Sequence, residues 1–135
     1  MKRDNQLILV VEDFEDSRFM MRRLLEMAGY SVVEASDGEQ AVELAVQERP
    51  AVILMDLSLP KLDGLAATRQ IRQHRRVSKI PIVAVSAHDS AESRSEALEA
   101  GCDEYVTKPI DFDQLDRLLK RLLPKDVTRT GNIES

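Results

Sequence analysis

Short apolar runs alternate along the chain with longer stretches in which apolar residues recur every three or four positions. Five runs are predicted to be β-strands: Leu7–Val11, Ser31–Ala35, Ala51–Met55, Pro81–Val85 and Glu104–Val106. The first, third and fourth runs are apolar at nearly every position, whereas a strand with one face in water alternates apolar and polar residues. Such uniform runs are typical of parallel strands that helices cover on both faces.

The stretches between the runs have the period of amphipathic helices. The most regular of them places Leu115, Leu118, Leu119 and Leu122 on one face. The boundary signals are Gly29 and Gly101 as helix ends, Ser36 with Glu39 as a capping box, Gly64 just before a helix, Asp111 with Gln114 as cap and partner, and Pro124 as a stop. Each predicted helix therefore has at least one boundary or one apolar face encoded locally.

Strand and helix alternate five times, which predicts a (βα)5 domain. Alternation at this spacing implies a parallel sheet with right-handed crossovers between two layers of helices, a three-layer α/β sandwich. We expect residues 6–123 to form this single domain. Residues 124–135 are polar and without periodicity, and we expect them to form a flexible C-terminal tail.

Composition places the chain among soluble globular proteins. It has 135 residues, of which 43% are hydrophobic and 32% charged. The longest apolar runs reach only about a quarter of a membrane span, and the run after the basic N-terminus is too short for a signal peptide. We therefore expect a cytoplasmic protein with no membrane association. The single cysteine, Cys102, excludes an internal disulfide and a multi-cysteine zinc site.

The net charge of -5, from 24 acidic and 19 basic residues, disfavours non-specific binding to nucleic acid or anionic lipid. One basic stretch runs against this average: Arg69, Arg72, His74, Arg75, Arg76 and Lys79. It has no interleaved aromatic residues, so it does not favour stacking with bases. We interpret it as the solvated end of a helix, with a docking patch for an acidic partner as the alternative.

Polar residues gather where the predicted strands end. Glu12 and Asp13 follow the first strand, Asp56 ends the third, Ser86 ends the fourth, and Lys108 follows the fifth. In open α/β sheets ligands bind beyond the carboxyl ends of the strands. We therefore expect three carboxylates, a hydroxyl and an ammonium group to meet at one edge of the sheet.

This set of groups indicates phosphoryl chemistry assisted by a metal. Clustered carboxylates repel one another unless a cation intervenes, and an all-oxygen site with few protein ligands suits Mg²⁺. Lys108 and Ser86 could hold a transferred anion, and a carboxylate can act as the covalent nucleophile. The five glycines lie at least nine positions apart, which excludes the G-x-G-x-x-G and G-x-x-x-x-G-K-[ST] phosphate loops.

Four segments in order resemble the receiver domain of two-component response regulators, of the stand-alone, single-domain, CheY-like type. They are Glu12-Asp13 after LILVV, Asp56 within MDLSLPKLDG, Ser86-Ala87 after PIVAV, and Lys108-Pro109 within YVTKP. The resemblance covers residues 6–123. It implies a flavodoxin-like fold with a five-stranded parallel sheet of order 2-1-3-4-5.

The resemblance also implies the role of each acidic residue. Asp56 would accept a phosphoryl group from a phosphohistidine of a sensor histidine kinase or a histidine phosphotransfer protein. Asp13, Asp56 and the backbone carbonyl of Ser58 would bind Mg²⁺ directly, and Glu12 would act largely through metal-bound water. The protein would be a signalling switch that catalyses only its own phosphorylation and dephosphorylation, rather than an enzyme acting on other substrates.

The remaining implied roles concern the switch. Lys108 would pair with the phosphoryl oxygens, and its bond to Pro109 would be cis. Ser86 would move toward the phosphoryl group, and Tyr105 would follow by turning inward. These movements would reshape the face made by the fourth helix, fifth strand and fifth helix, which would bind an unknown downstream protein. The protein would be a monomer or a weak phosphorylation-dependent dimer.

Several positions depart from the commonest family pattern. Glu12 stands where the family often has aspartate, Ser86 replaces a frequent threonine, and Leu59 replaces a frequent methionine. Ser58 and His88 occupy positions that tune the lifetime of the phosphorylated state in the family.

Three other interpretations stay open at this point. An aspartate-nucleophile phosphatase commonly has a second acid two residues after the nucleophile, where this chain has Ser58. A flavodoxin-like cofactor binder needs a hydroxyl- or glycine-rich loop and usually aromatic residues, but this chain has no Trp and 4% aromatic residues. A pseudo-receiver would bind partners without phosphorylation, and an absence of Mg²⁺ binding would favour it.

Overall fold

The computed structural model of the protein describes residues 6–59 and 61–123. Strand and helix alternate five times, as the apolar pattern predicts. The elements are β1 (Leu7–Val11), α1 (Glu15–Met27), β2 (Ser31–Ala35), α2 (Gly38–Glu48), β3 (Val52–Asp56), α3 (Gly64–Gln73), β4 (Ile82–Ser86), α4 (Ala91–Ala100), β5 (Glu104–Thr107) and α5 (Phe112–Leu122). The predicted tail 124–135 and the stop at Pro124 lie outside the described residues.

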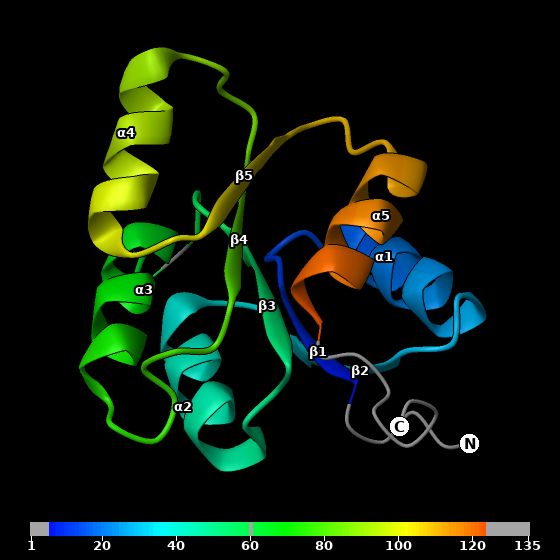
Figure 1. Ribbon diagram of the computed structural model, residues 1–135, viewed down its shortest axis with the longest axis horizontal. Helices are drawn as coiled ribbons and strands as arrows, with labels where there is room; N and C mark the ends of the chain where they lie inside the picture. Colours follow the sequence, from blue (N-terminus) through cyan, green and yellow to red (C-terminus); the bar gives the residue numbers. More distant parts are fainter. Residues whose placement is uncertain (1–5, 60, 124–135) are drawn as a thin grey trace, which may run out of the picture.

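The five strands form one parallel sheet in the order β2-β1-β3-β4-β5, which confirms the predicted topology. Helices α2, α3 and α4 cover one face, and α1 and α5 cover the other (Figure 1). The strands pair in register so that Val11 lies beside both Ala35 and Met55, and Ser86 lies beside Thr107. All strands therefore end at the same edge of the sheet.

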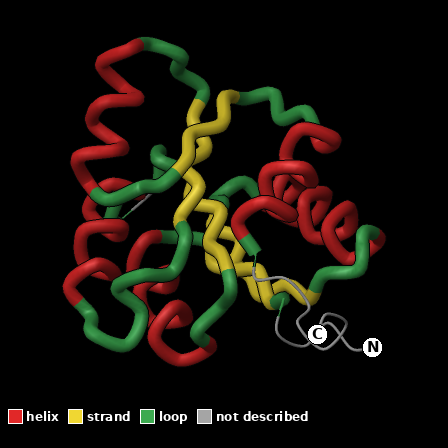
Figure 2. The backbone as a smooth tube through the Cα atoms, in the orientation of Figure 1, coloured by secondary structure: helices red, strands yellow, loops and turns green. Residues whose placement is uncertain are grey.

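The core consists of two apolar layers, one on each side of the sheet. The strands lie between the two groups of helices (Figure 2). Alternate side chains of each central strand enter opposite layers, as the pleat requires. In β3, Ile53 and Met55 pack toward α2–α4, whereas Val52 and Leu54 pack toward α1 and α5. Every residue of β3 and β4 is buried, which explains why these runs are apolar throughout. None of the described helices is long and apolar enough to span a membrane.

Helix boundaries follow local chemistry, with one correction. Asp111 caps α5, as predicted, by accepting hydrogen bonds from the backbone N–H groups of Asp113 and Gln114. Helix α2, however, is capped by Asp37, one residue after the predicted Ser36, and Asp37 accepts from Gln40 N–H. The prediction chose the earlier of two adjacent capping residues. Strands β3 and β4 likewise each lie one residue later than predicted.

Arg72 is partly buried and bound to backbone carbonyls of three other residues, rather than part of a solvated helix end. Its Nε donates to the Gly101 carbonyl at 2.9 Å, and one Nη donates to the Ser78 and Ile80 carbonyls at 3.0 and 2.7 Å. The other Nη pairs with Asp103 at 2.8 Å. One guanidinium thus ties α3 to the end of α4 and to the segment leading into β4. The sequence interpretation of the basic stretch is wrong at this residue.

Replacing Arg72 with methionine is expected to lower the free energy of unfolding by about 3 kcal/mol, because three carbonyl groups lose their donor at once. The matched control is Arg76→Met, which alters an exposed side chain of the same basic stretch. Its effect is expected to stay within about 0.5 kcal/mol. Urea unfolding of the three proteins measures the difference, and equal midpoints would show that the Arg72 contacts do not stabilise the fold.

Candidate functional site

The carboxyl edge of the sheet brings the predicted acidic residues together. Glu12 and Asp13 follow β1, and Asp56 ends the neighbouring strand β3. One carboxylate oxygen from each of the three lies within 4.8 Å of the others. Glu12 is held at this edge by its backbone N–H, which donates to the Ala35 carbonyl at 3.0 Å. Strand order therefore assembles a cluster whose members lie up to 44 positions apart in the chain.

Asp56 is the most enclosed acid of the cluster, with 3% of its surface exposed. Its Oδ1 accepts from the Ser58 backbone N–H at 2.9 Å, and its Oδ2 accepts from Lys108 Nζ at 3.0 Å. The loop that follows it is tied back to the sheet by the Leu57 N–H, which donates to the Val85 carbonyl. A buried carboxylate is tolerated here because both of its oxygens have partners.

Lys108 is the cation that bridges the cluster. Its Nζ lies 3.0 Å from Asp56 Oδ2 and 3.3 Å from Glu12 Oε1. Burial lowers the pKa of Lys108, but the hydrogen bond and charge of Asp56, together with Glu12, outweigh it and raise that pKa above its usual value. The amine is therefore fixed in its charged form. The peptide bond from Lys108 to Pro109 is cis, as the family resemblance predicts.

Glu12 has a perturbed acidity. Burial raises the pKa of its carboxyl group, and the charge of Asp56 acts in the same direction. The hydrogen bond from the Phe14 backbone N–H, 2.9 Å long, and the charge of Lys108 lower the pKa but do not cancel the rise. Burial and the charge of Asp56 thus destabilise the ionised form of Glu12, and a bound cation would stabilise it.

The loop after β3 is packed so closely that it requires glycine at position 64. A Cβ atom at Gly64 would lie 2.7 Å from Leu57 Cα and closer still to the Asp56 carbonyl oxygen. The Gly64 N–H donates to the Leu57 carbonyl, and Asp63 caps α3 through the Ala66 N–H. The backbone that carries Asp56 and Ser58 therefore rests directly on the first turn of α3.

The other predicted site residues lie on the same edge. Ser86 is buried at the end of β4, where its Oγ accepts from the His88 N–H and its carbonyl accepts from the Lys108 N–H. Tyr105 on β5 is half-buried, and its hydroxyl donates to the His88 carbonyl at 2.7 Å. Ser58 is placed by its N–H bond to Asp56. The metal-binding role of the Ser58 carbonyl and the switch roles of Ser86 and Tyr105 stay predictions.

The cluster fits a small divalent cation. Glu12, Asp13 and Asp56 supply only oxygen atoms, and the ligands range from buried Asp56 to exposed Asp13, so water could complete the coordination. Burial and mutual repulsion already disfavour the charged form of Glu12. Mg²⁺ prefers this combination of few carboxylates and several waters. These three residues are the candidates for holding it.

The fold and the site together define a class: parallel α/β proteins with an acidic, lysine-bridged pocket at the carboxyl edge of the sheet. The family model of the response regulator receiver domain matches residues 8–120. The alkaline phosphatase synthesis transcriptional regulatory protein PhoP of Bacillus subtilis is 39% identical over 119 residues, which cover 88% of this chain and 49% of that protein. The chain belongs to the response regulator receiver domain family.

Solved structures agree with this assignment. The receiver domain of sensor histidine kinase PA1611 from Pseudomonas aeruginosa PAO1, with a magnesium ion coordinated in its active site cleft, is 39% identical with a TM-score of 0.82 and coverage of 87% of this chain and 97% of that one. The receiver domain of Saccharomyces cerevisiae Ssk1, solved with the histidine phosphotransfer protein Ypd1, is 28% identical with a TM-score of 0.82 and coverage of 87% and 88%. The chain spans about half the length of the curated relatives it matches.

Proposed function

We propose that this receiver domain accepts a phosphoryl group on Asp56 from a phosphohistidine in a reaction that requires Mg²⁺, and that it signals by changing a protein-binding face. The observation that carries the proposal is the buried Asp56 carboxylate, fixed by Lys108 on one oxygen and the Ser58 N–H on the other. The magnesium ion in the PA1611 receiver domain and the Ypd1 complex of Ssk1 support the cofactor and the donor class.

The residues divide the chemistry between them. An Asp56 carboxylate oxygen forms the bond to phosphorus while the bond from phosphorus to the donor's histidine nitrogen breaks, and the imidazole leaves with the electron pair. Lys108 holds positive charge beside the accepting oxygen, and Ser86 offers a hydroxyl at the adjacent strand end. Mg²⁺ held by Glu12, Asp13 and Asp56 would neutralise charge on the phosphoryl oxygens. Such transfer depends mainly on positioning and electrostatics.

The donor protein is proposed to dock against α1. Phe14, Phe19 and Met20 are 60%, 57% and 63% exposed at the end of α1 nearest the acidic cluster. A pocket of about 550 Å³ joins this surface to the site. It is lined by Met20, Met21 and Leu24 of α1, by Pro109 and Ile110, and by Asp56 and Lys108. Exposed apolar side chains beside a reactive centre are typical of a protein-binding surface.

The output face is proposed to respond through Tyr105. The guanidinium of Arg94 on α4 lies 4.8 Å from the centre of the Tyr105 ring and pairs with Asp89 at 2.7 Å. The Tyr105 hydroxyl bonds to the carbonyl of His88, whose own N–H bonds to Ser86. A displacement of Ser86 toward a phosphoryl group would thus shift His88, and through it the position of Tyr105 and its contact with Arg94 on α4.

Two other functions have less support. Asp56 could serve as the turnover nucleophile of a phosphatase, but the neighbouring position 58 supplies a backbone N–H and a serine hydroxyl, with no acid to protonate a leaving group. A phosphorylation-independent adaptor would not need the buried Asp56–Lys108 pair. Steady phosphate release from phosphomonoesters would favour the first, and an absence of both Mg²⁺ binding and phosphorylation would favour the second.

The proposal is tested with a small acyl phosphate as donor. With Mg²⁺ present, the protein is expected to gain one phosphoryl group, detected by intact-mass spectrometry. Addition of a chelator in excess over Mg²⁺ should reduce the initial rate by at least about a hundredfold, because the charge neutralisation at the phosphoryl oxygens is lost. Restoring free Mg²⁺ should restore the rate. Equal uptake with and without the chelator would contradict the metal requirement.

A further inference from the structure

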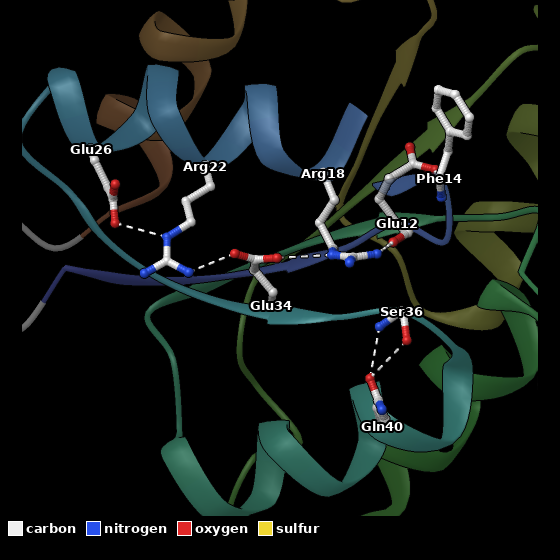
Figure 3. A network of polar contacts seen from close by, with 8 residues as sticks. All are labelled: Glu12, Phe14, Arg18, Arg22, Glu26, Glu34, Ser36 and Gln40. Carbon is white, nitrogen blue, oxygen red and sulfur yellow. Dashed lines mark hydrogen bonds and ion pairs between the residues drawn. The ribbon is translucent and has the colours of Figure 1, made fainter. Parts of the chain in front are cut away.

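A chain of ion pairs joins α1 to the edge strand β2 next to the site. Glu34 on β2 lies between two arginines of α1, with its Oε1 2.8 Å from Arg18 Nε and its Oε2 2.6 Å from an Nη of Arg22 (Figure 3). Arg22 also pairs with Glu26 one turn further along the helix at 2.9 Å. The hydrogen bonds from Arg22 and then Arg18 hold the pKa of Glu34 below its usual value. Glu34 is therefore a charged anchor for both arginines.

Arg18 differs from Arg22 because it also reaches the site. One Nη of Arg18 donates to the backbone carbonyl of Glu12 at 2.9 Å, while Nε of the same guanidinium is held by Glu34 (Figure 3). The planar guanidinium presents these donors in a fixed geometry. Its side chain is 18% exposed, against 42% for Arg22. Arg22 has no contact with Glu12 among those found for the described part of the chain.

The position of the Glu12 carbonyl affects the acidic cluster, because Glu12 begins the loop that carries two of the three acidic residues. The Glu12 N–H is tied to β2 through the Ala35 carbonyl, and its side chain accepts from the Phe14 N–H. Arg18 holds the carbonyl side of the same residue, and therefore the peptide that leads into Asp13. With Arg18 in place, Glu12 is restrained through its N–H, its carbonyl and its carboxylate.

We propose that Arg18, oriented by Glu34, is a positioning residue that pre-sets the loop of residues 12–14 for cation binding. Arg18 acts through the Glu12 carbonyl and is not itself a ligand. A loop already fixed in the binding geometry spares the cation the entropic cost of ordering it. The inference rests on the proposed Mg²⁺ site. It adds two residues that are not ligands: Arg18 on α1, whose side chain has no oxygen atom, and Glu34 on β2, which lies outside the acidic cluster.

The matched comparison uses Arg18→Met and Arg22→Met, which each remove one arginine from Glu34 and keep an apolar stem on α1. Magnesium is titrated into each protein while amide chemical shifts are followed. Arg18→Met should weaken Mg²⁺ binding by about tenfold, the scale expected when a group that orients a metal ligand is lost. Arg22→Met should change it by less than about twofold. Equal weakening in both variants would overturn the proposal.

A second measurement needs no metal. Amide exchange at Phe14, whose N–H bonds to Glu12, should be faster in metal-free Arg18→Met than in metal-free Arg22→Met, with global unfolding by urea measured alongside. If Arg18→Met does not fold, Arg18→Lys replaces it. Lysine keeps the positive charge but lacks the planar guanidinium that donates to Glu34 and to the Glu12 carbonyl at the same time. This variant should therefore also bind Mg²⁺ less tightly than wild type. Wild-type exchange and affinity in the Arg18 variant would overturn the inference.

These outcomes separate the inference from the proposed function. A wild-type protein that binds no Mg²⁺ would overturn the proposed cation site and, with it, the role of Arg18 toward that site. A wild-type protein that binds Mg²⁺ and takes up phosphoryl groups, with both properties unchanged in the Arg18 variant, would overturn the inference alone. The expected result is wild-type binding, a loss confined to Arg18, and faster exchange at Phe14.

Discussion

Replacing Asp56 with asparagine is expected to reduce phosphoryl incorporation from a small acyl phosphate to background. The substitution keeps the size of the side chain and an oxygen acceptor for Lys108 or the Ser58 N–H, but it removes the anionic nucleophile. The incorporated group should be acid-stable and base-labile in the wild-type protein and absent from the variant. Intact-mass spectrometry after incubation with Mg²⁺ and the donor measures both proteins directly.

The fold should survive this substitution. Asp56 raises the pKa of Glu12 through charge repulsion, and Lys108 keeps Glu12 as a partner when Asp56 is neutral. We therefore expect the free energy of unfolding to change by no more than about 1 kcal/mol. A matched control is Asp63→Asn, in the same loop, where asparagine caps α3 about as well as aspartate. It should retain wild-type uptake. Unchanged uptake in Asp56→Asn would move the nucleophile to another acid, with Asp13 first to be tested.

The convergence of the site could be predicted because it depends on topology rather than on side-chain detail. Uniform apolar runs indicate parallel strands, and parallel strands that alternate with helices end at one edge. Once Asp56 and Ser86 are assigned to strand ends, their meeting with Glu12 and Lys108 follows from the sheet order. The strand boundaries moved by only one residue in β3 and β4. That shift left each polar residue at the same edge.

The arginine contacts could not be predicted in this way. Arg18 and Arg72 each bind backbone carbonyls of other segments, and any residue type can present a carbonyl. A sequence pattern therefore contains no signal for the acceptor. Glu34 on β2 did offer a partial signal, because a charged residue follows two valines within the predicted strand. Its partners depend on how α1 crosses the edge strand, which periodicity does not specify.

The same argument explains the error at α2. Ser36 and Asp37 are adjacent residues of comparable capping ability, and each has a Glu or Gln three residues later. In the structure Asp37 accepts from Gln40 N–H, while the Gln40 side chain accepts from the backbone N–H and hydroxyl of Ser36. Both residues contribute to the turn before α2, so the local pattern located the start of the helix to within one residue. Packing of Gly38 against Leu62 explains why the helix starts with glycine.

Charge within the site is more informative than the net charge of the chain. An excess of five acidic residues is ordinary, but three carboxylates at one edge face a single bridging ammonium group among the described residues. The cluster keeps a formal surplus of two negative charges when all three acids are ionised, 3 − 1 = 2. That surplus equals the charge of one divalent cation. Removal of Lys108 and removal of the metal should therefore affect the site differently.

Replacing Lys108 with methionine is expected to separate cation binding from phosphorylation. Loss of the ammonium group 3.0 Å from Asp56 makes the cluster more negative, so Mg²⁺ should bind at least as tightly as in the wild-type protein. Phosphoryl uptake should nevertheless fall by on the order of 10²-fold, because the preorganised positive charge beside the accepting oxygen is gone. Titration of Mg²⁺ by amide chemical shifts and initial rates of uptake by mass spectrometry measure the two properties on the same samples.

Lys120→Met is the control for the loss of one lysine, because Lys120 is exposed on α5 and pairs with Asp116. Both its Mg²⁺ affinity and its uptake rate should match the wild-type values. A parallel loss of Mg²⁺ affinity and uptake in Lys108→Met would contradict the assignment and show that Lys108 mainly maintains the shape of the site. Retained Mg²⁺ affinity with slow uptake would instead show that Lys108 interacts with the phosphoryl group during transfer. In that case the metal site is intact, and only the phosphoryl oxygens have lost a positive charge.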